Sequence, residues 1–369
     1  MSLLCAMCVL AGIAADLFIV WQAAQARERL HIGTTPATLR RAMHTIGVII
    51  VSFNTHALLR ACLESLQTCT LQLRIVVVDN ASQDGSATLV REAFPAVDLI
   101  ALRENIGFAA GTNVGIRHLG VGTTPGALAT LQPLPGVPAS PPEYVLLLNP
   151  DTVVQPGAIE VLVAFLEQHP RVGAVGPRLL NPNGSVQAAA FRFPTLAMTA
   201  LDLFPPGEVL PGRLYNSWWH GRYPHESAAH ASFPIDHPLG ACILTRRAVL
   251  EQVGLLDEQF FMYAEEVDWC YRVRAAGWAI WQEPCAQVTH VGGASTRQFR
   301  GAMQIALYRS RLRFFQKHYS RAFIRANSWI VRMGMLRVVL RDWRAYMRGQ
   351  LNSDELRTRL WTYGTIARL

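Results

Sequence analysis

Short runs of aliphatic residues alternate with segments of helical spacing between residues 46 and 180. Such runs are typical of strands that are buried on both faces of a parallel sheet. They predict strands at 47–52, 74–79, 97–102, 144–148 and 172–175. Between them, apolar residues at every third or fourth position predict helices at 56–69, 86–94 and 158–169. This alternation predicts an α/β fold with a doubly wound, mostly parallel sheet and right-handed crossovers.

The pattern continues with a predicted strand at 239–245, a helix at 247–253 and a strand that ends at His290. Two stretches interrupt it. Residues 121–142 are rich in Gly, Pro and Ala without periodicity, which predicts an inserted surface loop. Residues 205–234 are irregular and rich in Trp and Tyr, which suits a lid or a carbohydrate platform as well as an ordinary surface loop.

The predicted central strand, 144–148, stops at Asn149-Pro150-Asp151. Pro150 ends the ladder because it has no N–H to donate and pushes Asn149 toward an extended conformation. Asp151 therefore lies at the carboxyl end of a central strand, where open α/β sheets bind their ligands. The alternative is an ordinary strand-to-loop turn, because Asn, Pro and Asp are all common turn residues.

The first two strands also end in polar side chains, Ser52 and Asn54 after one and Asp79 and Asn80 after the other. Neither the Gly-rich dinucleotide fingerprint nor a Walker loop follows them. A carboxylate such as Asp79 suits a base or a ribose hydroxyl, as in other nucleotide-binding folds. The alternative for Asp79, and equally for Asp84, is a role in the turn and cap before the next helix.

Glycines recur at four-residue spacing, at Gly107, Gly111 and Gly115, on the helix predicted after Asn105. Each glycine disfavours a helix by up to ~1 kcal/mol relative to Ala, so close packing or a nearby ligand must offset it. Packing accounts for Gly111 and Gly115. It leaves the amide groups of Asn105 and Asn113, which bracket the helix start, without an explanation.

A second polar stretch, Glu265-Glu266-Val267-Asp268, follows an aromatic run and opens a helix. Aromatic neighbours desolvate a carboxylate and raise its pKa, which suits a general base. The alternative for Glu265 and Glu266 is stabilisation of the helix N-terminus by acidic side chains. Asp268 is predicted to point inward and to pair with Arg272. His290, at the end of a strand, is either a structural residue or a metal ligand beside Asp151.

Composition narrows the class of protein. The chain of 369 residues is 51% hydrophobic and 16% charged, which indicates a globular protein near a membrane rather than a disordered one. Its formal net charge is +8, and only Lys317 of its 34 basic residues is a lysine. The seven scattered cysteines, an odd number, predict reduced thiols in a cytoplasmic compartment and not a disulfide framework.

Both ends of the chain differ from its middle. Residues 1–43 form an apolar leader in which 3–24 is about long enough for one membrane span. Asp16 makes that span marginal at a cost of about 2.5–3.5 kcal/mol. Translation from Met43 is the alternative. If the span exists, the arginines that follow it keep the next domain cytoplasmic.

The C-terminal tail, residues 301–369, is basic and predicted to be helical. Residues 300–349 hold twelve Arg and Lys against the single acid Asp342, interleaved with large apolar residues. Nucleic-acid binding is one interpretation, and a tail packed on the domain is another. A basic amphipathic helix on an anionic membrane is favoured over nucleic acid.

Six motifs occur in an order that resembles family 2 glycosyltransferases, especially the rhamnosyltransferase-like branch that builds bacterial cell-surface polysaccharides. The resemblance covers about residues 44–318, and its motifs are at 48–54, 77–86, 104–113, 147–151, 261–270 and 289–295. It implies a GT-A fold over 44–300, a nucleotide-sugar donor, a divalent cation (Mg²⁺ or Mn²⁺) and inversion at the anomeric carbon.

The same resemblance implies roles for single residues. The donor nucleoside would be held by Ser52, Asn54, Asp79, Asn80 and Asp84. Base and diphosphate would lie near Asn105, Gly107 and Asn113. Asn149-Pro150-Asp151 stands where the family has Asp-x-Asp, with Asn149 in place of the first acid. Asp151 would then be the main carboxylate ligand of the cation, and His290 a second ligand.

The family usually has Glu-Asp where this chain has Glu265-Glu266. Glu266 is the predicted base that deprotonates the acceptor hydroxyl, and the additional methylene leaves Glu265 as the alternative. The resulting prediction is an inverting transferase acting on a lipid-linked cell-surface glycan at the cytoplasmic face of the inner membrane, either peripheral or with one N-terminal span. dTDP-rhamnose is the favoured donor and a UDP-hexose the second choice. A non-catalytic subunit that binds nucleotide sugar is the alternative in a different class.

Overall fold

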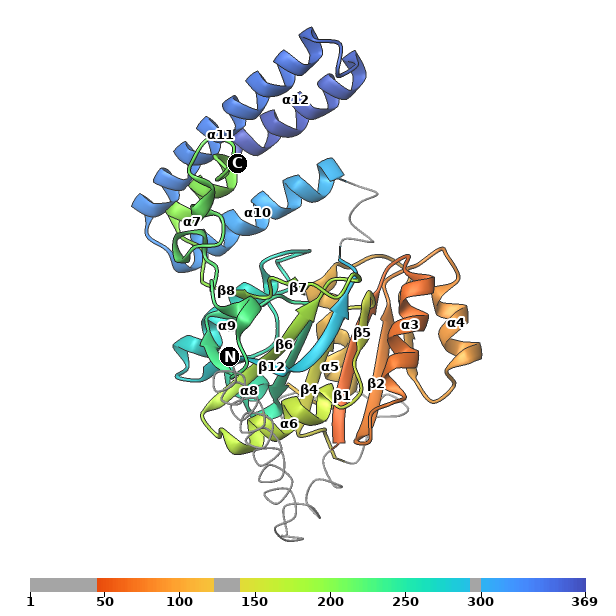
Figure 1. The fold of residues 1–369 in the computed structure, drawn as a ribbon. Coiled ribbons are helices and arrows are strands. Elements are labelled where there is room, and N and C mark those ends of the chain that lie inside the picture. The colour runs from red at the N-terminus through yellow and green to blue at the C-terminus, as the bar shows by residue number, and fades with distance from the viewer. Residues whose placement is uncertain (1–44, 123–139, 293–299) are drawn as a thin grey trace, which may run out of the picture. The chain divides into compact units, whose positions relative to one another are not determined.

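The computed structural model describes residues 45–122, 140–292 and 300–369. The described residues belong to one compact unit, which spans 44–369 (Figure 1). The predicted leader, most of the loop at 121–142 and the end of the last motif therefore lie outside the described residues. Among the helices within these ranges, none combines the length and the hydropathy needed to cross a membrane.

Four parallel strands form one half of the main sheet, in the order β3-β2-β1-β4. Their bounds are β1 (Thr45–Ser52), β2 (Gln72–Asp79), β3 (Asp98–Ala101) and β4 (Tyr144–Leu148). All five residues of β4 are buried, as expected for a strand covered on both faces. The strands predicted from aliphatic runs are confirmed to within a few residues at each end.

The other half continues from β4 in the order β11-β6-β12-β5. Its bounds are β5 (Thr152–Val154), β6 (Val172–Leu180), β11 (Cys242–Arg246) and β12 (Ala279–His290). β11 runs antiparallel between β4 and β6, whereas β6 and β12 are parallel. The strand predicted at 239–245 begins only at Cys242, because residues 239–241 leave the sheet and line a cavity.

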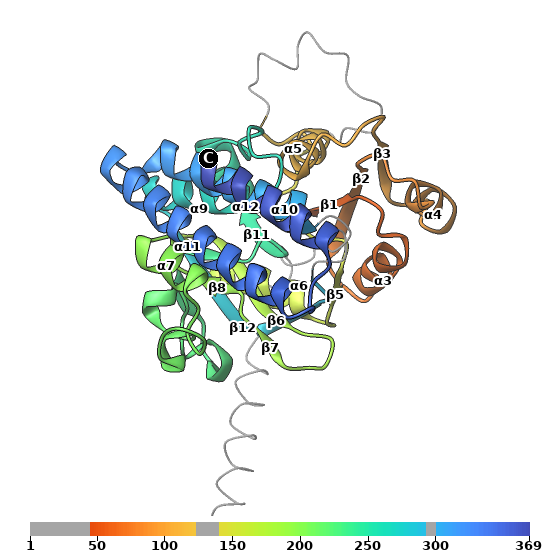
Figure 2. The same cartoon turned by 90° about the horizontal axis from the view of Figure 1, so that it is seen from above.

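Helices cover both faces of this sheet, which confirms the doubly wound prediction. One face packs on α3 (His56–Leu66), α4 (Ser86–Ala93) and α6 (Ala158–Gln168). The opposite face packs on α5 (Phe108–His118), α8 (Arg247–Val253) and α9 (Glu265–Ala275). Figure 2 shows α3 and α5 on opposite sides of β1 and β2.

The C-terminal part is helical, as predicted. It comprises α10 (Arg300–His318), α11 (Arg321–Met347) and α12 (Ser353–Arg368), and α11 and α12 lie side by side (Figures 1 and 2). Together with α7 (Leu196–Leu203) they enclose a small apolar core of Leu203, Ile305, Val331, Met335, Tyr363 and Ile366.

The region between β6 and β11 contains several short elements. These are β7 (Val186–Gln187), β8 (Ala190–Phe191), η1 (Gly212–Leu214), η2 (Trp218–His220), η3 (Glu226–Ala228), β9 (Phe233–Ile235) and β10 (His237–Pro238). β9 pairs with β12, and β8 pairs with β10. The irregular stretch at 205–234 is therefore tied to the sheet at its carboxyl end, while Trp218 and Trp219 remain exposed.

The glycine-rich motif divides into two parts. The spacing of the glycines predicts Gly107 within the helix, but Gly107 lies outside it. It precedes α5 with φ +88°, in the left-handed region that favours glycine. Gly111 and Gly115 do lie in α5, where a Cβ would come within 3.0 Å of Val51 and 2.8 Å of Ile49. Close packing of α5 on the sheet accounts for these two glycines.

Candidate active site

A cavity of about 310 Å³ opens at the carboxyl ends of β1, β2 and β4. Eight of the residues singled out from the sequence line it: Asn80, Asn105, Gly107, Asn149, Asp151, Glu265, Glu266 and His290. The cavity lies where open α/β sheets bind ligands. Its volume is in the range of small-molecule sites.

Asp151 and His290 approach each other in this cavity from β4 and from the end of β12. Both side chains are almost fully buried, and Nε2 of His290 lies 3.4 Å from Oδ1 of Asp151. The other ring nitrogen, Nδ1, lies 2.7 Å from Oε1 of Gln187. The amide nitrogen of Gln187 donates to Asn181, which leaves Oε1 to accept from the histidine. A neutral His290 therefore presents the lone pair of Nε2 to Asp151.

Two hydrogen-bond acceptors at this distance favour a positive charge between them. A carboxylate and an imidazole nitrogen are ligands that Mn²⁺ accepts, and Mg²⁺ is usually held by one or two carboxylates together with substrate phosphates and water. No group of three or more His, Cys, Asp or Glu side chains gathers around a common point in the described part of the chain. Asp151 and His290 thus fit a divalent cation as two of its ligands.

Glu265 and Glu266 begin α9 directly after two residues with left-handed backbone, Tyr263 (φ 69°) and Ala264 (φ 64°). Left-handed conformation is uncommon outside glycine, and consecutive instances often mark functional sites. Oε2 of each glutamate is buried, with no hydrogen-bond partner among the described residues. The loop thus orients two unsatisfied carboxylates at the cavity wall.

Burial raises the pKa of both glutamates. For Glu265 the pKa rises well above its ordinary value of 4.5, chiefly through desolvation and further through the charge of Glu266. Desolvation also raises the pKa of Glu266, although its own backbone N–H and that of Val267 oppose this shift. A carboxyl group with a raised pKa is better suited to accept a proton near neutral pH than an ordinary surface glutamate.

Gly240 provides the space for one of these acids. A Cβ at this position would lie 3.2 Å from Cγ and 3.3 Å from Cδ of Glu266. The backbone at 240 therefore approaches the carboxylate more closely than any other residue type allows without displacing it. Gly240 lies in the segment that the sequence suggested as a strand.

Asn80, Asn105 and Gly107, which also line the cavity, form a hydrogen-bond network. Nδ2 of Asn80 donates to Oδ1 of Asn105 (2.9 Å) and to the carbonyl of Gly107 (3.1 Å), and Oδ1 of Asn80 accepts from the N–H of Ile106. The N–H of Phe108 donates to the carbonyl of Phe261 at 2.8 Å. The amide of Asn80 therefore holds the loop at 105–107, and the bond between Phe108 and Phe261 ties this loop to the segment that precedes the glutamates.

Four predicted nucleoside ligands lie near the cavity but do not line it: Ser52, Asn54, Asp79 and Asp84. The hydroxyl of Ser52 bonds Thr55, and Oδ1 of Asn54 accepts from the N–H of Gln83. Asp84 accepts from the N–H of His56 and from Ser86, which matches the turn role considered as its alternative, whereas Gly85 is the N-cap of α4. These three side chains therefore shape the loops that follow β1 and β2.

Asp79 differs from these three residues. Its Oδ2 accepts from the N–H of Ser82 at 3.0 Å, but its Oδ1 is buried without a partner in the described structure. An unsatisfied buried carboxylate oxygen is costly. A donor group from a bound ligand would satisfy it.

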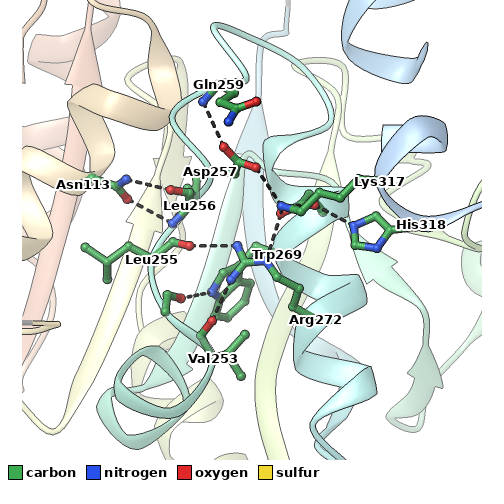
Figure 3. Close-up of polar contacts among 12 residues, drawn as sticks. Asn113, Val253, Leu255, Leu256, Asp257, Gln259, Trp269, Arg272, Lys317 and His318 are labelled. Atoms are coloured by element: carbon green, nitrogen blue, oxygen red, sulfur yellow. Dashed lines mark hydrogen bonds and ion pairs between the residues drawn. The ribbon is translucent and has the colours of Figure 1, made fainter. Parts of the chain in front are cut away.

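Asn113, also predicted to bind the donor, is a structural clamp (Figure 3). Its Nδ2 donates to the carbonyl of Leu256 at 2.8 Å, and its Oδ1 accepts from the N–H of the same residue at 3.1 Å. Nδ2 also donates to Glu258. Asn113 does not line the cavity.

Sequence reasoning missed several lining or supporting residues. Gln187 orients His290 from the two-residue strand β7, and nothing in its local sequence marks it. Gly240 was treated as part of a strand, and Met303 of α10 as part of the tail, yet both line the cavity. Phe261 also lines it, although the motif at 261–270 contains this residue without giving it a role.

Comparison with known proteins defines the class. Residues 44–309 match the family described as "Glycosyltransferase like family 2", and the chain therefore belongs to the family 2 glycosyltransferases. The mixed, mostly parallel sheet with helices on both faces is the GT-A fold that the motifs predicted.

Relatives with established names are similar over most of the chain. The N-acetylglucosaminyl-diphospho-decaprenol L-rhamnosyltransferase of Mycobacterium tuberculosis is 28% identical over 290 residues, which are 78% of this chain and 89% of that protein. The low-salt glycan biosynthesis hexosyltransferase Agl10 of Haloferax volcanii is 29% identical over 63% of each chain. The solved structure of the mannosyltransferase PcManGT from Pyrobaculum calidifontis, with GDP-Man and Mn²⁺, covers 87% of this chain and 84% of its own, with a TM-score of 0.48 and 16% identity.

Proposed function

We propose that this glycosyltransferase moves L-rhamnose from dTDP-rhamnose to a hydroxyl of a lipid-linked glycan, with inversion at the anomeric carbon. The observation that carries the proposal is the unsatisfied pair Glu265 and Glu266 in one cavity with Asp151 and His290. The rhamnosyltransferase relative, which is named for an N-acetylglucosaminyl-diphospho-decaprenol acceptor, supports the choice of sugar and the lipid-linked acceptor.

The donor is held by the loops at the carboxyl ends of β1 and β2. Asp79 accepts a hydrogen bond from the nucleoside through its unsatisfied Oδ1. Ser52, Asn54 and Asp84 keep these loops in place, and the Asn80–Asn105 pair shapes the wall beside the diphosphate. Asn149, at the end of β4, borders the same cavity.

Asp151 and His290 hold Mg²⁺ or Mn²⁺ in this proposal. When bound, such a cation offsets charge on the diphosphate and so stabilises it as a leaving group. Gln187 keeps the lone pair of His290 directed at the same point as Asp151.

Glu266 is the proposed base. Its carboxylate takes the proton of the acceptor hydroxyl as that oxygen bonds to the anomeric carbon. The bond from this carbon to the diphosphate breaks on the opposite side, and the nucleoside diphosphate leaves. Attack from the face opposite the leaving group inverts the configuration. Glu265 is more deeply buried, and the charge of Glu266 opposes its ionisation.

The deciding experiment combines a donor panel with paired glutamate variants. The intact chain is incubated with dTDP-rhamnose, UDP-hexoses and GDP-mannose, with Mn²⁺, Mg²⁺ or EDTA, and an undecaprenyl- or decaprenyl-diphosphate N-acetylglucosamine acceptor. Glu266→Gln should abolish transfer and leave metal-dependent donor binding almost intact. Glu64→Gln, an exposed glutamate on α3, is the matched control. NMR of the product reports the anomeric configuration.

Other outcomes redirect the assignment. Selection of a UDP-hexose would replace rhamnose, a choice that the hexosyltransferase relative also supports. Donor binding without any transfer would indicate a non-catalytic binding subunit. If Glu266→Gln keeps full turnover and Glu265→Gln loses it, the base is Glu265 and not Glu266.

We further infer that the enzyme works at the cytoplasmic face of the inner membrane, because its proposed acceptor carries a lipid. Its net charge of +8 favours contact with anionic headgroups. Peripheral attachment through the C-terminal helices suffices for this. Separation of membrane and soluble fractions, with and without high salt, tests the attachment.

A further inference from the structure

Helix α11 has two apolar faces. One is buried against the rest of the C-terminal core: Val331, Gly334 and Met335 are covered, and a Cβ at Gly334 would come within 2.7 Å of Leu203 on α7. This packing fixes how the helix is rotated about its axis. The opposite face of α11 is therefore directed away from the core.

That opposite face carries a line of large apolar side chains, each about half exposed or more. We call it the α11 stripe: Trp329 (64%), Met333 (51%), Leu336 (50%), Leu340 (49%), Trp343 (51%) and Met347 (69%). Their spacing alternates between four and three residues, which places them along one side of a helix. At 1.5 Å per residue the stripe is about 27 Å long. A continuous exposed apolar surface of this kind marks an interaction site.

Arginines border the stripe on both sides. On a helix with 100° per residue, Arg325 and Arg332 lie along one margin and Arg344 and Arg348 along the other. All four are exposed. The single acid of residues 300–349, Asp342, is buried and accepts from Arg341, Arg359 and Tyr363. The margins of the stripe are thus positively charged, with no exposed acid on this helix.

A second copy of the chain is one occupant that the spacing would suit, because alternation of three and four is the coiled-coil repeat. The charges oppose it. Two α11 helices in contact would bring their arginine margins together without an exposed acid on either helix to pair with them. An anionic lipid surface supplies the opposite charge along both margins and an apolar layer for the centre.

The residue types of the α11 stripe suit insertion into a lipid surface. Trp329 and Trp343 lie fourteen positions apart on the stripe, and Trp prefers the boundary between headgroups and acyl chains. We propose that α11 lies in the plane of an anionic membrane with the α11 stripe inserted at this boundary. This inference deepens the proposed function and rests on it for its purpose, because a lipid-linked acceptor is reached at that surface.

Helix α10 links the C-terminal helices to the active-site cavity. That helix packs on α12, where a Cβ at Gly301 would lie 3.1 Å from Thr362, and it contributes Met303 to the cavity wall. The surface helices and the cavity therefore share a structural element.

Quenching of Trp fluorescence by brominated phosphatidylglycerol in vesicles tests the inference on the intact chain. Replacement of Trp329 and Trp343 by Phe should remove most of the quenching that wild type shows. Replacement of Trp218 and Trp219, two exposed tryptophans of the 205–234 stretch, is the matched control and should leave it largely unchanged. This comparison reports insertion of the stripe even if another segment also contacts lipid.

Flotation with vesicles measures affinity. Leu336→Gln combined with Leu340→Gln should weaken binding at least about tenfold, since each substitution replaces an inserted apolar side chain by a polar one. Arg344→Gln and Arg348→Gln should each weaken binding to phosphatidylglycerol vesicles about fivefold. Neither arginine change should alter the weaker binding to pure phosphatidylcholine. Circular dichroism verifies that the variants are folded.

Two results would overturn the inference. One is equal quenching in wild type and in the Trp329→Phe, Trp343→Phe variant. The other is a dimer in sedimentation velocity without lipid that the Leu336→Gln, Leu340→Gln variant loses, which would assign the stripe to a second copy. Donor binding and transfer to the prenyl-diphosphate acceptor are measured in parallel. Stripe insertion without donor binding or transfer to the prenyl-diphosphate acceptor would refute the transferase proposal and leave the membrane surface standing. Transfer without stripe insertion would refute the membrane surface and leave the transferase proposal standing.

Discussion

Nε2 of His318 lies 2.7 Å from Oδ1 of Asp268, joining α10 to the helix that begins with the two glutamates of the candidate active site. Lys317 and Arg272 also contact this carboxylate, at 2.9 Å each, and Asp268 is fully buried. Arg272 in turn donates to the carbonyls of Val253 and Leu255 (Figure 3). The predicted pairing of Asp268 with Arg272 is confirmed, and the structure extends it to α10.

Asp268→Asn should destabilise the fold by about 3 kcal/mol, because it removes the buried counter-charge of Arg272 and Lys317. Thermal unfolding should show a lower Tm for this variant. Asp354→Asn, at a 90% exposed side chain, is the control and should have little effect. An unchanged Tm for Asp268→Asn would mean that α10 is held on α9 by apolar packing alone.

Glu265→Gln should make the protein more stable at neutral pH. The pKa of Glu265 is raised well above 4.5 in the fold, first by burial and then by Glu266. A carboxyl with a raised pKa contributes stability that is fully present below the unfolded pKa and is lost as the pH rises through the folded pKa. The variant should therefore gain about 2–4 °C in Tm at pH 7, corresponding to ~1 kcal/mol.

The same comparison below pH 4.5 should show almost no difference between Glu265→Gln and wild type. Unfolding is followed by circular dichroism across this pH range. A gain that persists in acid would indicate that the glutamine stabilises by a new hydrogen bond and not by removing a charge.

Gly240→Ala should reduce the rate of transfer more than the affinity for donor. The added methyl would stand 3.2 Å from Cγ of Glu266 and must displace the proposed base or the loop. A fall in kcat of at least about tenfold is expected, because small displacements of a catalytic group are costly. Gly212→Ala is the control, since its nearest neighbour would be 3.9 Å away. Equal kcat in both variants would remove Gly240 from the active site.

The sequence allowed the sheet and one edge of the cavity to be predicted, for a simple physical reason. Buried strands such as β4 are recognised in the sequence by short apolar runs. The carboxyl ends of parallel strands meet at one edge of a sheet. Polar residues that follow them, such as Asn80 and Asp151, therefore gather there. The resemblance carried by the six ordered motifs then assigned more distant residues, including Glu266 and His290, to the same site.

Residues that act through long-range contacts could not be placed in this way. Asn113 bonds a backbone 143 positions away, and Gln187 reaches His290 across 103 positions. Nothing in their local sequence carries that information. The same limit applies to Met303, whose helix was interpreted only from its charge and amphipathic pattern.

Asn113→Ala should lower stability without altering donor affinity. It removes hydrogen bonds at 2.8 and 3.1 Å to Leu256 and leaves buried backbone groups unpaired, at a cost of about 1–3 kcal/mol. Chemical denaturation measures the loss, and calorimetric titration with the nucleoside diphosphate and Mn²⁺ measures affinity. A donor affinity reduced tenfold in a variant of wild-type stability would restore Asn113 as a ligand of the donor.

Gln187→Leu should weaken Mn²⁺ binding about 10- to 100-fold, the usual effect of removing a residue that orients a metal-binding histidine. Gln187 accepts from Nδ1 of His290 and so directs Nε2 toward Asp151. Gln155→Leu is a matched control, because Gln155 bonds Thr289, the neighbour of His290, and not the histidine itself. Titration of Mn²⁺ in the presence of nucleoside diphosphate, followed by electron paramagnetic resonance, gives both affinities. If Gln187→Leu and Gln155→Leu both bind Mn²⁺ as tightly as wild type, the prediction is wrong. In that case Gln187 does not orient His290 for metal binding, and Asp151 holds the cation without His290.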